Sequence, residues 1–307
     1  MLQQGIVINA EDNSCRVDKW LKNKYQIPYT LIQKLFRKQD VLVNSKKVDA
    51  KYILKTGDLV RCYGIDLFEK IQHQDVSDDE YNKLLTQIKQ CILFEDNNLV
   101  VINKPYSVAV QNGSKIKLSI DTILPDLSQD VKCRLVHRLD RYTTGVLVLG
   151  KSKEASNDLV SLFKEHNMSK QYLAVLIGIP KQKEGIIRSY IKKLDFGDKE
   201  KVSSDDDGKE AITKFKVLSI SKDRRYSLVQ FSPVTGRMHQ IRVHASEELR
   251  CPVLGDGKYK LDSSQNNLKM HLHAYKIQFS LNSKNYNITA PLPDHMNITM
   301  KKSELQL

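Results

Sequence analysis

Apolar residues recur along this chain at two different periods, and each period predicts a different kind of element. Near the beginning, apolar positions follow helical spacing in two short stretches, at 17–21 and at 31–36, which Pro28 separates. After residue 90 they mostly form short continuous runs or alternate with polar residues, as buried and half-buried strands do. The pattern predicts two short helices first and a larger, strand-rich region afterwards.

The segment after the second predicted helix has the signature of a β-hairpin. Its sequence is VLVNSKKVD at 41–49, with Asn44 and Ser45 at the expected turn, and TGDLVRC at 56–62 adds a turn and a closing strand. On the helix itself Lys34, Arg37 and Lys38 are spaced so that all three share one face. Like charges there cost helix stability, which a bound polyanion would relieve; an ordinary solvated lysine face is the alternative.

The strand-rich region contains several distinct runs. Buried strands are predicted at 92–94, at 99–102 before Lys104 and Pro105, and at 146–149 between two glycines, with alternating strands at 212–217 and 226–231. An amphipathic helix is predicted at 155–163, and the polar stretch 193–210 reads as an exposed turn. Strands outnumber helices, which predicts an α+β fold with a mixed, largely antiparallel sheet.

Charge is unevenly distributed and suggests domain boundaries. Residues 1–63 hold 12 Lys and Arg against 6 Asp and Glu, residues 64–90 hold 3 against 6, and the remainder holds 34 against 24. We therefore expect a basic module at 11–63, a linker at 64–90 and a main domain at 91–300. A short amphipathic helix at the end of the linker is compatible with this, because Tyr81, Leu84, Leu85 and Ile88 follow helical spacing.

The composition of the chain limits the classes of molecule that it is expected to bind. The 307 residues carry a formal net charge of +13, which favours nucleic acid or an anionic membrane surface. No apolar run is long enough to span a bilayer, and the first residues lack the pattern of a secretory signal. Five scattered cysteines without a CxxC pair indicate reduced thiols in a cytoplasmic protein, with no zinc ligand set.

The densest cluster of charge lies at 135–151, LVHRLDRYTTGVLVLGK. His137, Arg138, Asp140 and Arg141 fall in a predicted turn immediately before a buried strand. A carboxylate that is partly buried there needs a cationic partner, since an unpaired one would become neutral. From spacing alone, a structural ion pair and a catalytic carboxylate both remain open.

Three stretches in order make a family resemblance. HRLDRYTTGVLVLGKS at 137–152, KQYLAVLIG at 170–178 and PVTGRMHQIRVHASEELRCPVLGDGKY at 233–259 resemble the motifs of the RluA-type pseudouridine synthases. The N-terminal pattern resembles the S-four RNA-binding module. Within that family, the combination is most similar to the ribosomal large subunit group. The resemblance implies a pseudouridine synthase catalytic domain, a small N-terminal α/β RNA-binding module, and 23S ribosomal RNA as substrate.

The resemblance also implies roles for individual residues. Asp140 would be the essential carboxylate, kept ionised by Arg242, and Tyr172 would stack on the target base. Whether the carboxylate attacks the base, attacks the sugar or acts as a base stays open. Arg138 would help to displace the base, and its alternative role is that of a second ion-pair partner of Asp140. Lys34, Arg37 and Lys38 would bind RNA.

The sequence offers no cofactor signature: it has no GxGxxG and no Walker loop, and His239, His244, His271 and His273 have no metal-ligand spacing. We expect neither cofactor nor metal, no membrane association, and a monomer.

A kinase is excluded because the letters run HRLD and no other kinase motif accompanies them. The main rival is a non-catalytic RNA-binding or ribosome-assembly protein on the same scaffold, which predicts a broken Asp, Tyr and Arg set. A nucleoside hydrolase would need paired carboxylates or a metal.

Overall fold

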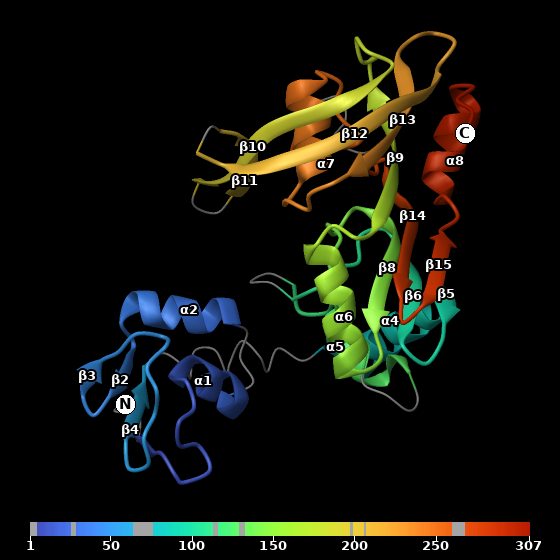
Figure 1. The fold of residues 1–307 in the computed structure, drawn as a ribbon. Helices are drawn as coiled ribbons and strands as arrows, with labels where there is room; N and C mark the ends of the chain where they lie inside the picture. Colours follow the sequence, from blue (N-terminus) through green and yellow to red (C-terminus); the bar gives the residue numbers. More distant parts are fainter. Residues whose placement is uncertain are drawn as a thin grey trace. The chain divides into compact units, whose positions relative to one another are not determined.

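The computed structural model describes residues 5–25, 29–63, 76–112, 116–128, 133–196, 199–205, 207–259 and 268–307. The chain forms two compact units, one of Met1–Glu80 with Asn112–Lys117, and one of Tyr81–Gln111 with Leu118–Leu307 (Figure 1). Residues 64–75, the first part of the predicted linker, lie outside the described residues. The expected division into RNA-binding module, linker and catalytic domain stays a prediction about function.

The first unit has the predicted pair of helices, α1 (Val17–Tyr25) and α2 (Tyr29–Lys38). They accompany an antiparallel sheet in the order β1-β4-β2-β3, formed by Ile6–Val7, Leu59–Cys62, Val41–Val43 and Lys46–Lys47. Asn44 and Ser45 both have positive φ, 50° and 64°, as the two central residues of a type I′ hairpin turn require. The predicted hairpin is therefore confirmed, and its apolar side chains join those of both helices in one buried cluster.

The second unit is built on one large sheet, whose path runs β11-β10-β12-β13-β9-β14-β8-β6-β5 with β15 on β14 and β7 on β8. Among the described pairs only β14 and β8 run parallel, so the predicted α+β class with a largely antiparallel sheet is confirmed. The strands are β5 (Ile92–Glu95), β6 (Leu99–Lys104), β7 (Arg134–Leu135), β8 (Thr144–Gly150), β9 (Ser169–Ile177), β10 (Glu184–Phe196), β11 (Lys199–Ser204), β12 (Lys209–Ile220), β13 (Tyr226–Pro233), β14 (Leu272–Leu281) and β15 (Lys284–Thr289).

Helices cover both faces of this sheet, which explains why β8 is apolar at every position from Val146 to Leu149. Its odd-numbered residues pack with α4 (Asp78–Gln90) and α5 (Ile120–Leu127), and its even-numbered residues pack with α6 (Lys153–Lys164). β9 is covered in the same way. Its Leu173 and Val175 face α8 (Asp294–Lys302), whereas the opposite face meets α7 (Gln240–Val243) and the π-helix η1 (His244–Glu248) (Figure 1).

The predicted exposed turn at 193–210 is wrong. β10 continues to Phe196, and β11 pairs with it in antiparallel register from Ile191↔Ser204 to Phe196↔Lys199. Between β11 and β12, a short turn lies around Gly208. Polar residues can form such a hairpin because main-chain hydrogen bonds hold it, so the sequence shows no apolar period there.

Gly145 marks the point where β8 begins to run beside β14. Its φ is +105°, and a Cβ atom there would lie 2.2 Å from the carbonyl oxygen of Ala274 on β14. Only glycine fits this conformation and this close approach. The glycine of the motif therefore fixes the strand that follows Asp140 against the centre of the sheet.

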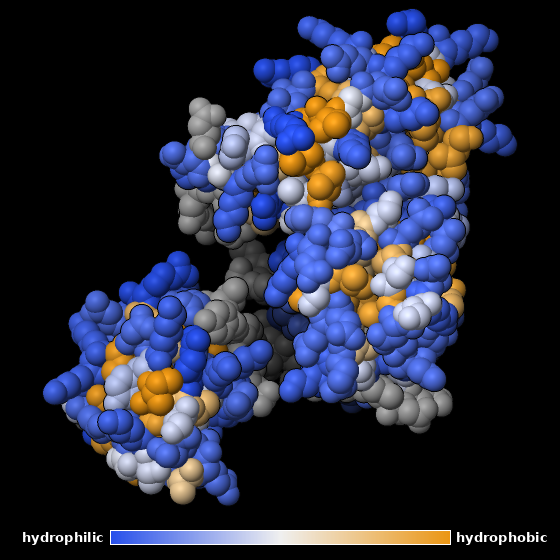
Figure 2. Space-filling view, viewed as in Figure 1, coloured by the Kyte–Doolittle hydropathy of each residue, from blue (hydrophilic) through white to orange (hydrophobic). Residues whose placement is uncertain are grey.

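The visible surface of each unit is mainly hydrophilic, with hydrophobic residues in separate patches (Figure 2). Among the described residues, no helix combines the length and the hydrophobicity that crossing a bilayer requires.

Candidate active site

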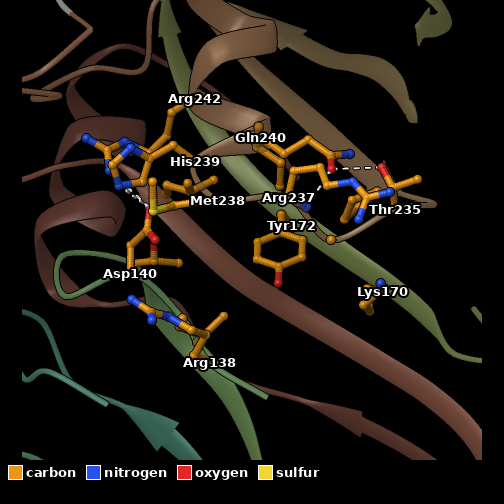
Figure 3. Close-up of a pocket in the computed structure, with 16 residues that line it drawn as sticks. Arg138, Asp140, Lys170, Tyr172, Thr235, Arg237, Met238, His239, Gln240 and Arg242 are labelled. Atoms are coloured by element: carbon orange, nitrogen blue, oxygen red, sulfur yellow. Dashed lines mark hydrogen bonds and ion pairs between the residues drawn. The ribbon is translucent and has the colours of Figure 1, made fainter. Parts of the chain in front are cut away.

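A pocket in the second unit brings together three stretches that are far apart in sequence. Most of its lining comes from the loop before β8, from β9, and from α7 with the segment that leads into it, and Leu272 of β14 adds to it (Figure 3). The pocket has a volume of about 240 Å³ and includes Asp140, Tyr172 and Arg242 together with Arg138. These four residues were expected to share a site, and the fold places them around one cavity.

The predicted contact between Asp140 and Arg242 is present. Nη1 of Arg242 donates to Oδ2 of Asp140 at 3.0 Å, across 102 residues of chain. The Asp140 side chain is 22% exposed and that of Arg242 is 7% exposed. A carboxylate at a pocket wall is thus accessible to a ligand while it remains paired with a nearly buried guanidinium.

Asp256, which the sequence analysis did not single out, holds the other edge of the same guanidinium. Nε and Nη2 of Arg242 donate to its two oxygens at 2.6 and 2.8 Å. The Asp256 side chain has no exposure, and its Oδ1 also accepts from the backbone amides of Lys258 and Tyr259. Such a two-point clasp fixes the plane of the guanidinium, so Nη1 is aimed at Asp140.

The charges of this cluster stabilise one another. Burial alone would raise the pKa of Asp256, but the Arg242 guanidinium and the backbone amides outweigh it and lower that pKa. Burial alone would lower the pKa of Arg242, but its carboxylates Asp256 and Asp140 outweigh it and raise that pKa. Arg242 therefore stays cationic inside the protein.

His239 completes this wall of the pocket. Its Nε2 lies 3.7 Å from Oδ2 of Asp140, and its Nδ1 shares a 2.8 Å hydrogen bond with the hydroxyl of Tyr259. Burial, opposed by the charge of Asp140, lowers the pKa of His239 to about 4. The ring is therefore neutral near pH 7, and it does not compete with Arg242 for the carboxylate.

Tyr172 and Arg138 lie on other sides of the cavity (Figure 3). Burial, reinforced by the charge of Asp140, raises the pKa of the Tyr172 hydroxyl, which therefore keeps its proton at neutral pH. Arg138 is exposed, and among the described residues Asp140 forms its ion pair with Arg242, while the ring beside it, His239, is neutral. The alternative role of Arg138 as an ion-pair partner of Asp140 is thus not seen.

Lys104, which the sequence analysis mentioned only as the end of a strand, is fully buried. Its ammonium donates to the carbonyls of Pro105, Val108 and Arg141 at 3.0, 2.9 and 3.0 Å. Burial lowers its pKa to about 7. These three bonds tie the 105–108 loop to the residue that follows Asp140. Nothing in the sequence signalled this role, because lysine is rarely buried.

The four histidines noted in the sequence have separate partners. His244 bonds Ser189, His271 bonds Thr299, and His273 bonds Thr144. Within the part of the chain that the structure describes, no group of His, Cys, Asp and Glu could hold a metal ion.

The three cationic residues predicted to bind RNA in the first unit are not part of this pocket. Lys34, Arg37 and Lys38 are all exposed on α2, as a surface that meets a ligand would be.

The clasp on Arg242 can be tested by replacing Asp256 with Asn. Removing one partner of a buried ion pair leaves the other charge poorly compensated, which costs about 3–5 kcal/mol. We expect calorimetry to show a lower free energy of unfolding for the second unit. Because the folded pKa of Asp256 is lowered, the difference from wild type is full above about pH 4 and shrinks as the pH falls below it.

Asp223→Asn is the matched control, because Asp223 forms an ion pair with Arg225 on the surface. Solvent screens that pair, so its loss should change the melting temperature far less. Equal effects of the two substitutions would contradict a structural role for the Asp256 clasp.

Several known proteins are similar to this chain in sequence and in fold. Residues 98–247 match the family model described as RNA pseudouridylate synthase. The chain is 38% identical over 306 residues to ribosomal large subunit pseudouridine synthase C of Rickettsia bellii (strain RML369-C), covering 95% of this chain and 99% of that protein. With the protein of the same name from Vibrio parahaemolyticus, the identity is 32% over 299 residues, covering 94% and 93%. The solved structure of human RNA Pseudouridylate Synthase Domain Containing 4 superposes with a TM-score of 0.65 at 30% identity, covering 75% of this chain and 98% of that one. The family resemblance seen in the motifs is thereby confirmed, and this chain belongs to the RNA pseudouridylate synthases, isomerases that convert uridine in RNA to pseudouridine.

Proposed function

We propose that this protein isomerises specific uridines of bacterial 23S ribosomal RNA, with Asp140 as the essential carboxylate. The observation that carries the proposal is the ion pair of Asp140 with Arg242 at the wall of a pocket that Tyr172 also lines. The relatives that match nearly the whole chain are named for the ribosomal large subunit. The rRNA of a bacterial cell lies in its cytoplasm, so the enzyme would act there. It would act as a monomer.

The reaction needs a carboxylate that is ionised, positioned and shielded. The bond from C1′ to N1 breaks, uracil turns over, C1′ bonds to C5, and the proton of C5 is lost while N1 gains one. Asp140 can attack the base, attack C1′ or take up a proton from the sugar. In each case Arg242 holds the carboxylate in place through Nη1. The chemistry requires no redox step, so it calls for no cofactor.

Tyr172 and Arg138 would act on the target base. The tyrosine ring offers a face on which an extruded uracil can stack, and its hydroxyl, which keeps its proton, can assist a late proton transfer. Taking a base out of its stack costs a few kcal/mol, and a side chain that fills the gap offsets part of that cost. The exposed guanidinium of Arg138, beside the same pocket, is suited to that task.

Asp140→Asn tests the proposed activity directly. The amide keeps the shape of the side chain but cannot act as nucleophile or base, so we expect pseudouridine formation in 23S rRNA to fall at least about a thousandfold. Affinity for the same RNA should stay within about threefold, since no phosphate contact is removed. The target uridines are first mapped by sequencing, as those modified in cells that carry the gene but not in cells that lack it. The rate of pseudouridine formation at these uridines is then measured in single-turnover reactions.

Asp158→Asn, on the exposed surface of α6, should behave as wild type. Full activity of Asp140→Asn would refute the role of the carboxylate. A wild-type protein that binds 23S rRNA without modifying it would instead support the non-catalytic RNA-binding protein.

The three exposed cations of α2 would bind RNA phosphates. Replacing Lys34, Arg37 and Lys38 with Gln should weaken binding to 23S rRNA most at low salt. The slope of log affinity against log salt should become shallower by about two to three, because each phosphate contact contributes roughly 0.7–0.9. Lys222, Lys301 and Lys302, also exposed, provide a control triple in the second unit. A slope equal to that of wild type would show that α2 does not contact RNA.

A further inference from the structure

Lys170 lines the pocket with Asp140 and Tyr172. It lies on β9 two residues before Tyr172, so the two side chains point to the same face of the sheet. In Figure 3, Lys170 lies on the other side of Tyr172 from Asp140, with the cavity among them. A base that stacks on Tyr172 would therefore bring its own nucleotide within reach of this ammonium group.

Lys170 differs from Arg138 and Arg237, the two exposed cations of the lining, because it is partly buried and has no counter-charge. Among the described residues, none forms a hydrogen bond or ion pair with its ammonium, although the side chain is only partly exposed. Burial lowers its pKa from the ordinary value of 10.5. A cation that is partly desolvated and unpaired is unfavourable in the free protein, and an arriving anion would relieve that cost.

The pocket has no carboxylate to spare for Lys170. Among the lining residues Asp140 is the one acidic side chain, and it already accepts from Arg242. Asp256, behind the wall, is fully engaged by the same guanidinium and by two backbone amides. Arg138 and Arg237 add two further cations to the lining, and His239 is neutral. The lining thus carries an excess of positive charge, which suits an anionic ligand.

We propose that Lys170 binds a phosphodiester group next to the target uridine and so fixes the extruded nucleotide over Tyr172. This inference rests on the proposed function, and it names the part of the RNA that the site recognises. A phosphate supplies the full negative charge that an unpaired ammonium lacks, whereas the uracil oxygens are neutral in the ground state. An ammonium group is also a compact point charge, which binds one phosphate oxygen without the planar fork of an arginine. Lys170 would thus be a substrate-binding residue for the known reaction.

The test compares Lys170→Met and Lys170→Arg with wild type on a synthetic RNA that carries one mapped 23S uridine. We expect Lys170→Met to bind this RNA about tenfold more weakly at low salt, with a salt slope shallower by about 0.7. The rate of conversion at saturating RNA should change much less than the affinity. Lys170→Arg should keep the salt slope of wild type. Lys302→Met removes an exposed charge on α8, which covers the opposite face of β9, and should change none of these values.

A second arm locates the contact on the RNA. A methylphosphonate placed 5′ or 3′ of the target uridine removes the charge of one phosphate. For wild-type enzyme, one of the two positions should lower the affinity about tenfold, and the same position should have little further effect on Lys170→Met. The first of these two results does not depend on the stability of any variant, because it is measured on wild-type enzyme alone.

The possible results are distinct. If neither methylphosphonate weakens binding by wild-type enzyme, the phosphate contact is refuted. It is also refuted if Lys170→Met lowers only the rate at saturating RNA, and that result would be explained by a contact between Lys170 and the uracil. Both outcomes are interpreted only when wild-type enzyme forms pseudouridine in this RNA. Failure of the proposed function would appear instead as wild-type enzyme that forms no pseudouridine in this RNA.

Discussion

The guanidinium of Arg242 lies between two carboxylates, and the arrangement of the active site depends on it. Asp256 takes Nε and Nη2, which leaves Nη1 for Asp140. Taking three charged groups out of water is costly unless each is paired and hydrogen-bonded. Here the buried carboxylate, Asp256, accepts hydrogen bonds at both oxygens, and the other carboxylate, Asp140, is open to the pocket. The carboxylate that lines the pocket is thus the one that can accept further hydrogen bonds.

The fold fixes both ends of this interaction with elements that have few alternative positions. Gly145 allows β8 to approach β14 closely, and this anchors the chain just after Asp140. Lys104 binds the carbonyl of Arg141 on one side and the 105–108 loop on the other. Arg242 lies on a short helix whose neighbours Ile241 and Ala245 are buried against β9 and β13. The two charged groups therefore meet because the packing of β8 on β14, and of α7 on β9 and β13, brings the Asp140 loop and Arg242 together.

Much of this could be predicted from the sequence, because the central strands and helices bury continuous or periodic apolar runs. The contact between Asp140 and Arg242 was implied by the resemblance of the motifs to the family. Asp256 and Lys104 were missed, since their roles depend on which carbonyl or guanidinium a folded loop presents. β11 was missed for a related reason, because a hairpin of mostly polar residues held by main-chain bonds has no apolar period. Sequence patterns report burial well, but they report the partners of a buried polar group poorly.

Arg242 must bind two carboxylates at once for the active site to be arranged as it is, and Arg242→Lys tests this requirement most directly. A lysine keeps the charge but cannot hold Asp256 at two points while it reaches Asp140. The measurement is the single-turnover rate of pseudouridine formation in 23S rRNA, with RNA affinity determined in parallel. We expect a rate at least about a hundredfold lower, as for loss of one preorganised donor, with affinity within about threefold of wild type. A variant that converts uridine at nearly the wild-type rate would contradict it.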